Sequence, residues 1–370
     1  SRRLAAEAPA AGAAAGAGAA AGAGASAADA RVARAGLART YQTSQLFGSI
    51  SVLDNVALAD LPHQDLGPNQ IRVRNAYLSV DPYMRGRMTT VKSYVPGFEV
   101  DQPMTGGAVG EVIESTAEGY AVGDKVMHMN GWRDEAIVDI AGGGAPTDPQ
   151  KLPPLNIPIQ TFLHNLGLTG ATAYMGLMKT ASAKPGDIVF VSAAAGAVGS
   201  AVVQIAKKKG MTVIGSAGGA AKCEWVRSLG ADACVDYKAG NLLEQLSAAA
   251  PNGIDVYFDN VGGDHLDAAF ALARDYARFA ICGMIDVYND FKAQPMQYLP
   301  MIIGKRIMIK GFLYPDFYAQ VPEFNADMAG LIQSGAVKGR ETVKDGLEKT
   351  PEAFLGLFSG ENTGKMLVKL

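Results

Sequence analysis

The chain has 370 residues, of which 48% are hydrophobic and 19% charged, a composition typical of a globular protein large enough for two domains. Its net charge of −3 argues against a protein that binds nucleic acids or anionic membranes, because both attract basic surfaces. The three cysteines, Cys223, Cys234 and Cys282, form no C-x-x-C pair, which excludes a four-cysteine zinc site. They are also too few for a disulfide framework and favour a reducing compartment, so we expect a cytoplasmic location.

Residues 1–59 differ in composition from the rest of the chain. Residues 4–36 are mainly alanine and glycine, too weakly hydrophobic to span a membrane, and predict a disordered low-complexity segment; an organellar transit peptide is the alternative. Residues 36–59, GLARTYQTSQLFGSISVLDNVALA, resemble part of the branched-chain amino-acid transporter ATPases. Since the sequence has no G-x-x-x-x-G-K-[ST] loop, we expect no ATPase activity. We interpret residues 1–59 as a segment of separate origin outside the folded core.

Short segments of alternating hydrophobicity follow over residues 60–155. IRVRNAYLSV, GGAVGEVIES and GDKVMHMNGWRDEAIVDI have the period-two pattern of strands and are separated by glycine-containing turns. This stretch therefore predicts a mainly β domain.

Strand-like and helix-like segments alternate over residues 156–310. DIVFVSA leads into a helix over 197–209, TVIGSA leads into a helix over 220–229, and ACVDY, IDVYFDNV and RFAICG continue the series. This alternation is typical of a doubly wound parallel sheet, the Rossmann fold. The remaining residues, 311–370, end in KMLVKL, a strand that we expect to return to the β domain.

The first strand-to-helix turn of this series carries a dinucleotide-binding motif. Ala194-x-Gly196-x-x-Gly199 is the glycine fingerprint with alanine at its first position. Small residues there let the backbone approach a pyrophosphate at a helix N-terminus, although a tight turn without a ligand has the same pattern. The next strand ends without the acidic residue that binds the ribose of NAD, and Lys222 follows it. Unless Lys222 is a solvated surface lysine, NADP(H) is the expected cofactor.

The segment YLSVDPYMRGRM, residues 77–88, is the most specific motif in the chain. Together with GGAVGEVIES, LGLTGATAYMGL, SAGGAAKCEWV, FDNVGG, CGMIDVYN and NTGKMLVKL, it resembles the NADPH-dependent alkenal/one oxidoreductases, a group of zinc-independent medium-chain dehydrogenase/reductases. The resemblance implies an α/β fold in which a Rossmann doubly wound parallel sheet accompanies a mainly β, GroES-like catalytic domain. This chain departs from the family at its N-terminal edge, where residues 36–59 replace an additional strand.

The resemblance also implies roles for residues at matching positions. Those expected at the pyrophosphate are Thr172, Gly196, Ala197, Val198 and Gly199. Those expected around the adenosine 2′-phosphate are Ser216, Gly218, Lys222 and Tyr237. Those expected along the rest of the cofactor are Asn260, Cys282, Gly283, Met284, Ile285, Phe312, Leu313 and Asn362. Each has a purely structural alternative, such as glycine packing, a turn-forming asparagine or a core phenylalanine.

The implied activity is reduction of the carbon–carbon double bond of an α,β-unsaturated aldehyde or ketone. The nicotinamide supplies hydride to the β carbon, so the protein must orient the ring and stabilise charge on the carbonyl oxygen, and no metal is required. Tyr288 is the expected proton donor or enolate stabiliser, because a phenol is protonated at neutral pH. The alternative is a proton from water or the ribose hydroxyl. Tyr83 and Tyr94 are weaker candidates for substrate contacts.

Two other functions fit the same motifs. A quinone oxidoreductase would share the fold and cofactor, and a catalytically silent NADPH-binding protein would keep only the nucleotide site. A zinc-dependent alcohol dehydrogenase is not expected, because GGAVGEV stands where that class has its metal ligands. Nor is a short-chain dehydrogenase, because Tyr174 and Lys179 lack the Tyr-x-x-x-Lys spacing. We expect a small unsaturated carbonyl compound as substrate and a monomer or homodimer as the oligomeric state.

Overall fold

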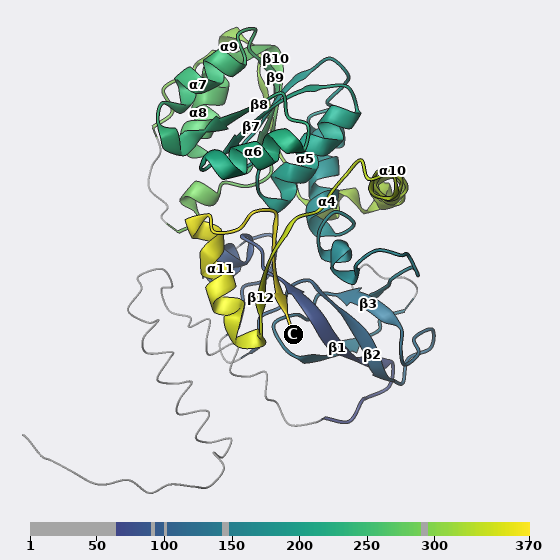
Figure 1. Ribbon diagram of the computed structural model, residues 1–370. Coiled ribbons are helices and arrows are strands. Elements are labelled where there is room, and N and C mark those ends of the chain that lie inside the picture. Colours follow the sequence, from purple (N-terminus) through teal and green to yellow (C-terminus); the bar gives the residue numbers. More distant parts are fainter. Residues whose placement is uncertain (1–63, 90–92, 100–101, 143–147, 290–294) are drawn as a thin grey trace, which may run out of the picture.

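The computed structural model describes residues 64–89, 93–99, 102–142, 148–289 and 295–370. These residues form two lobes, each built on one sheet (Figure 1). This arrangement confirms the expected α/β fold, with a doubly wound parallel sheet beside a mainly β unit. The predictions for residues 1–59 lie outside the described residues, and the domain boundaries near 60, 155 and 310 stay predictions.

The lower lobe contains a seven-stranded sheet in the order β12-β13-β1-β2-β3-β5, with β4 also paired to β1. Its strands are β1 (Gln70–Ser79), β2 (Ala108–Ser115), β3 (Lys125–His128), β4 (Glu135–Asp139), β5 (Gln150–Lys151), β12 (Glu341–Asp345) and β13 (Lys365–Lys369). All pairs are antiparallel except β12 with β13. Strand β1 pairs with β4 through residues 70–74 and with β13 through residues 77–79, so it changes partner along its length.

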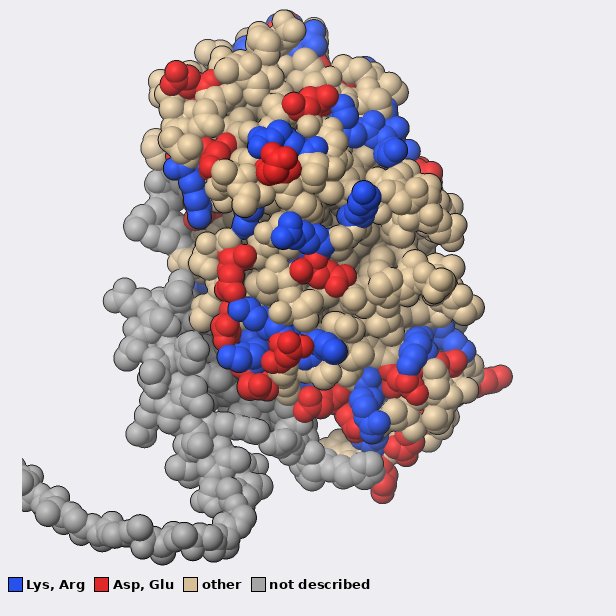
Figure 2. Space-filling model, in the orientation of Figure 1, with Lys and Arg blue, Asp and Glu red and all other residues tan. Residues whose placement is uncertain are grey.

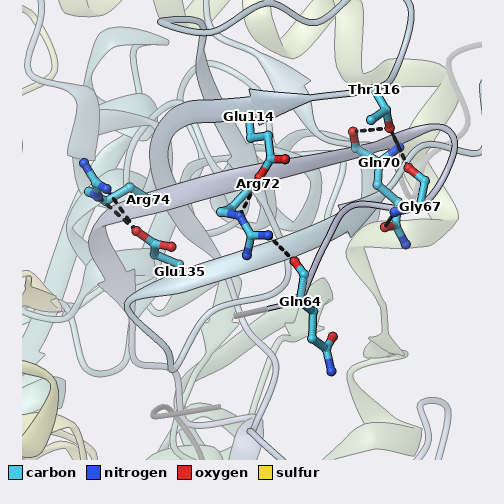
Figure 3. Close-up of polar contacts among 8 residues, drawn as sticks. All are labelled: Gln64, Gly67, Gln70, Arg72, Arg74, Glu114, Thr116 and Glu135. Atoms are coloured by element: carbon cyan, nitrogen blue, oxygen red, sulfur yellow. Dashed lines mark hydrogen bonds and ion pairs between the residues drawn. The ribbon is translucent and has the colours of Figure 1, made fainter. Parts of the chain in front are cut away.

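Polar side chains along β1 tie neighbouring segments to the sheet (Figure 3). Arg72 Nε lies 2.9 Å from Glu114 Oε2 on β2, and Arg74 lies 3.1 Å from Glu135 on β4. Arg72 also donates to the carbonyl oxygen of Gln64, which holds the segment before β1 against the sheet. These contacts lie outside the buried aliphatic side of the lobe, so they define strand pairing without disturbing the core.

The upper lobe contains six parallel strands in the order β11-β10-β9-β6-β7-β8. They are β6 (Ile188–Val191), β7 (Thr212–Ala217), β8 (Ala233–Asp236), β9 (Ile254–Asp259), β10 (Ala273–Ile281) and β11 (Met308–Gly311). The order reverses between β6 and β9, which is the switch point where open α/β sheets bind ligands. Val189, Phe190 and Val191 of β6 are completely buried, as expected for a central strand covered on both faces.

Helices cover both faces of the upper sheet (Figure 1). The helices of this lobe and of the junction are α4 (Leu168–Tyr174), α5 (Ala197–Lys208), α6 (Ala220–Ser228), α7 (Leu242–Ala249), α8 (Gly263–Leu272), α9 (Met301–Gly304), α10 (Val321–Gln333) and α11 (Thr350–Ser359). The lower lobe contains the short helix α3 (Met84–Arg87), and α11 packs against its strand β13 (Figure 1). Within the described part of the chain, every helix is too short or too polar to cross a bilayer.

The surface carries both signs of charge in alternation. Figure 2 shows basic and acidic side chains intermingled over both lobes on the face presented. This distribution agrees with the small net charge of −3 and gives that face no basic stripe of the kind that binds nucleic acid.

Candidate active site

The turn between β6 and α5 carries the glycine fingerprint. A Cβ on Gly199 would lie 2.3 Å from Ala193 O and 2.8 Å from Ala194 Cα, so only glycine fits against the turn. A Cβ on Gly196 would meet only Ala193 O, at 3.2 Å, so packing constrains this position less. Gly196 precedes the first turn of α5, whose N–H groups have no partner within the helix. The turn therefore offers backbone donors and a positive dipole end to an anion.

Residues from two other segments lie against this turn. Gly364 forms a parallel bridge with Gly196, and its N–H donates to Ala195 O at 2.8 Å. The side chain of Asn362 donates to Gly364 O at 2.8 Å, so the structure brings Asn362 beside the turn. Thr172 lies half-buried on α4, which packs against α5, and donates to Leu168 O at 2.7 Å.

A cationic site lies at the carboxyl ends of β7 and β8. A Cβ on Gly218 would lie 2.7 Å from Tyr237 Oη and 2.9 Å from Lys238 Cε, which places both side chains beside the β7 end. Lys222 Nζ donates to the carbonyl oxygens of Gly360 at 2.6 Å and Asn362 at 2.7 Å. Burial, with a contribution from Lys238, lowers the pKa of Lys222. Two ammonium groups at one strand edge suit a doubly charged phosphate.

The sequence analysis missed Lys238 at this site. Its only local signal is a basic residue two positions after the end of β8. Ser216, which was expected here, is completely buried, and its hydroxyl has no hydrogen-bond partner among the described residues. This buried hydroxyl lies on β7, whose carboxyl end carries the cationic site.

The end of β9 is held to the end of β6 by a buried polar network. The backbone N–H of Asn260 donates to Ser192 Oγ at 2.8 Å, and its side chain donates to Ser192 O at 2.8 Å. Asp259 accepts from Tyr257 Oη at 2.7 Å, and burial raises the pKa of this carboxyl group. The Asn260 amide therefore orders the strand ends, in agreement with its alternative role as a turn former.

The segment after β10 places a tyrosine at the same edge of the sheet. The N–H groups of Cys282 and Gly283 donate to Asp259 O at 2.9 and 3.1 Å. Met284 N donates to Tyr288 Oη at 3.4 Å, and Ile285 N donates to Asn260 O at 3.3 Å. Burial raises the pKa of the Tyr288 phenol above its ordinary value and that of the Cys282 thiol to about 12. Both groups are therefore protonated at neutral pH.

Phe312 and Leu313 follow the edge strand β11. The Phe312 ring is 9% exposed and packs edge-to-face against Phe258 at 6.1 Å and Phe317 at 6.2 Å. Its tip is so close to Gly176 that a Cβ there would lie 2.4 Å from Phe312 Cζ. The ring thus belongs to the hydrophobic core, which was the alternative role for this residue, whereas Leu313 is half-buried.

The lower lobe contributes Tyr83, next to α3, and Tyr94. Tyr83 lies mostly buried close to the guanidinium of Arg87, and burial raises the pKa of its phenol. Tyr94 is 62% exposed, and it lies near enough to Tyr288 to influence the pKa of that phenol. Arg87 donates to Thr105 Oγ1 at 2.9 Å and covers the ring of Phe98 at 3.9 Å, which orders the loop that carries Tyr94.

One hydrogen bond joins the two lobes across this region. Arg85 Nε on α3 donates to Asn289 Oδ1, next to Tyr288, at 3.0 Å. Arg85 is 9% exposed, and burial lowers the pKa of its guanidinium. The sequence analysis assigned a role to neither residue, although Arg85 lies within the segment YLSVDPYMRGRM.

Among the residues that the structure describes, no group of three or more His, Cys, Asp or Glu side chains is arranged to hold a metal ion. The expectation of a metal-free reaction stays a prediction. His128, on β3, hydrogen-bonds through Nε2 to Asn75 Oδ1 at 2.8 Å and accepts at Nδ1 from Asn130 N at 3.1 Å. Burial lowers the pKa of His128 to about 4, and both ring nitrogens have structural partners.

Family models and known proteins match this chain over both lobes. The model for the N-terminal domain of oxidoreductases matches residues 39–143, and the model for zinc-binding dehydrogenases matches residues 197–332. The NADPH-dependent curcumin reductase of Escherichia coli is 40% identical over 311 residues, which cover 82% of this chain and 88% of the relative. The NADP(+)-dependent 2-alkenal reductase of Nicotiana tabacum is 41% identical over 309 residues, with coverage of 82% and 88%.

The same likeness holds in three dimensions. The crystal structure of CurA from Vibrio vulnificus in complex with NADPH has a TM-score of 0.77 and 39% identity to this chain. The match covers 83% of this chain and 93% of the Vibrio protein.

Proposed function

Since this chain belongs to the zinc-independent medium-chain dehydrogenase/reductases, in the group of NADPH-dependent alkenal and enone reductases, we propose that it uses NADPH to reduce the carbon–carbon double bond of α,β-unsaturated aldehydes and ketones. One geometric observation supports this proposal. The carboxyl ends of four parallel strands bring a glycine turn, a pair of lysines and a protonated tyrosine to one edge, opposite α3 of the other lobe.

The cofactor fits the chemistry of this edge. We propose that the N–H groups after Gly196 bind the pyrophosphate, and that Lys222 and Lys238, with Ser216 and Tyr237, bind the 2′-phosphate. Lys222 would then exchange its two carbonyl partners for phosphate oxygens. When bound, NADPH supplies the hydride for the reaction.

The protein must hold the enone and deliver a proton. We propose that Tyr288 donates a hydrogen bond to the substrate and then its proton, since burial raises the pKa of the phenol and keeps it protonated. Tyr83 and Tyr94 would contact the substrate from the lower lobe. The raised pKa of Cys282 keeps this thiol in its less nucleophilic form beside an electrophilic substrate.

The test is consumption of NADPH with trans-2-enals, a curcuminoid and a 1,4-quinone, with product identification. We expect the enals and the curcuminoid to lose their double bond, and we expect NADH and a saturated aldehyde to give little turnover. Turnover of the quinone alone would assign the protein to the quinone oxidoreductases. Tight NADPH binding without turnover of any substrate would identify a silent nucleotide-binding protein.

We further propose a homodimer that forms through the edge of the upper sheet, and a cytoplasmic location, which the three free cysteines support. All four residues of β11 are exposed, and the preceding helix exposes 81% of Ile303. An edge strand with unpaired backbone groups is a template for a second strand. We expect Ile309→Asp to convert a dimer into monomers in sedimentation; a monomeric wild-type protein would contradict the proposal.

A further inference from the structure

A buried ion pair links the last strand to the segment that follows β1. Lys365 Nζ donates to Asp81 Oδ1 and to Val80 O, both at 2.9 Å. The two charged side chains are 2% and 8% exposed, and Asp81 also accepts from Ser79 Oγ. Burying two charges costs several kcal/mol in desolvation, and an apolar pair of similar volume often gives equal stability. Stability alone therefore does not explain this pair.

The backbone at Lys365 touches the glycine turn of the candidate site. Gly364 forms the parallel bridge with Gly196 and donates to Ala195 O at 2.8 Å. Its φ of +73° favours glycine, and a Cβ there would lie 1.9 Å from Arg340 O. The backbone of Gly364 is consequently held between the glycine turn and Arg340, which directly precedes β12.

The other end of the ion pair lies directly before α3, the helix beside Tyr83, for which we propose a contact with the substrate. Asp81 O accepts from Met84 N at 3.2 Å and so begins the turn into α3. That turn carries Tyr83, and α3 carries Arg85, whose side chain reaches Asn289 beside Tyr288. A continuous series of contacts thus runs from the glycine turn, through Lys365 and Asp81, to the proposed proton donor.

We propose that Lys365 and Asp81 are positioning residues, which fix the distance between the bound nicotinamide and the enone by holding the α3 segment in register with the glycine turn. This inference rests on the proposed reductase function. Hydride transfer requires reacting atoms about 3–3.5 Å apart, and a displacement of about 1 Å can reduce the rate about 100-fold. Two directional hydrogen bonds from one ammonium group restrict sliding more than an apolar contact does.

The test replaces both members of the pair. Lys365→Met with Asp81→Asn removes both charges together, because removal of the lysine alone would leave a buried carboxylate unpaired and destabilise the fold. We expect kcat for a trans-2-enal to fall about 10-fold to 100-fold. We expect the dissociation constant for NADPH to change less than about threefold. We also expect the isotope effect with NADPH deuterated at the transferred position to increase, because hydride transfer becomes slower relative to other steps.

A second ion pair in the upper lobe provides the matched control. Arg278 Nη2 lies 2.7 Å from Asp187 Oδ2, with side chains 17% and 5% exposed, away from the strand ends that form the site. Arg278→Met with Asp187→Asn should lower the melting temperature while leaving kcat and the isotope effect unchanged. This control separates lost stability from lost positioning.

The possible outcomes discriminate between the two proposals. Wild-type kcat and isotope effect in the Lys365/Asp81 double variant would overturn the positioning role, as would an equal loss of kcat in the control. If the double variant does not fold, Lys365→Arg decides, because it keeps both charges paired but changes the geometry of the hydrogen bonds, and we expect a several-fold loss of kcat at unchanged NADPH affinity. Failure of the wild-type protein to reduce any enal or enone would instead reject the proposed function.

Discussion

The two lobes contribute different kinds of chemical group to the candidate site. The upper lobe presents backbone groups at the ends of parallel strands, with Gly196 and Gly199 allowing close approach. The lower lobe presents long side chains on the short helix α3 and the segments beside it, namely Tyr83, Arg85 and Tyr94. Backbone donors recognise a part that every NADP(H) molecule has, whereas side chains on loops are free to vary with the substrate. We therefore propose that the upper half selects the cofactor and that the lower half selects the substrate.

Replacement of the proposed acid should have the largest effect. Tyr288→Phe should lower kcat for a trans-2-enal about 100-fold to 1000-fold while leaving NADPH affinity unchanged, because only proton donation is lost. Wild-type activity should persist past pH 10, since burial raises the pKa of this phenol. Tyr276→Phe, at a site 67% exposed, is the control and should keep full activity. Equal turnover by the Tyr288 variant would assign the proton to water or to the ribose.

Removal of a charge from the cationic site should weaken the binding of NADPH but not that of NADH. Lys222→Met should raise KM for NADPH about 10-fold to 100-fold, because a charge-assisted hydrogen bond is lost, and should leave KM for NADH nearly unchanged. Initial rates with both cofactors measure this effect. Lys208→Met, on the exposed end of α5, serves as the control. Parallel changes for NADPH and NADH would show that Lys222 does not contact the 2′-phosphate.

Addition of a methyl group at the glycine turn should lower the free energy of unfolding. Gly199→Ala forces a Cβ to within 2.3 Å of Ala193 O, so the turn must shift, and we expect a loss of about 1–3 kcal/mol in the free energy of unfolding. Gly330→Ala, on an exposed face of α10 with open space around it, should instead stabilise the protein by about 0.5–1 kcal/mol. Urea unfolding of both variants measures the contrast. A neutral Gly199 variant would mean that the turn adapts.

The smallest effect concerns pH and involves both lobes. Burial lowers the pKa of His128, in the lower lobe, and of His265, in the upper lobe, to about 4 from 6.5. The native state then binds fewer protons than the unfolded state. The contribution of each histidine to the free energy of unfolding is therefore fully present above pH 6.5. It falls as the pH drops from 6.5 toward 4, by about 1.4 kcal/mol per unit for each histidine.

Replacement of one histidine tests this contribution. The ring of His265 stacks on Phe190 at 6.4 Å, so His265→Phe keeps its packing and should weaken the loss of stability between pH 7 and pH 5.5 by about 1 kcal/mol. Urea unfolding at the two pH values provides the measurement. An unchanged pH dependence in this variant would show that His265 titrates normally in the folded protein.

The sequence predicted the upper lobe well because its signals are local. Val189, Phe190 and Val191 are apolar together because β6 is buried on both faces, and the glycine fingerprint follows directly. The contacts that complete the site are long-range and leave no local pattern. Nothing near Gly364 in the sequence indicates its bridge to Gly196, and nothing near Asp81 indicates Lys365. The fold and family could be recognised, whereas the links between the lobes required coordinates.

The change of partner along β1 has a consequence for the newly made chain. Tyr77, Leu78 and Ser79 pair with residues 367–369, so their edge of the sheet stays open until β13 has left the ribosome. At about 5–20 residues per second, this interval lasts about 15–60 s. In the last part of this interval, once β11 (Met308–Gly311) has been made, the upper lobe has all its strands and can fold, while the lower lobe still exposes an edge that favours aggregation. The pairing of β13 with β1 thus completes the sheet of the lower lobe only after all of its other strands have been made.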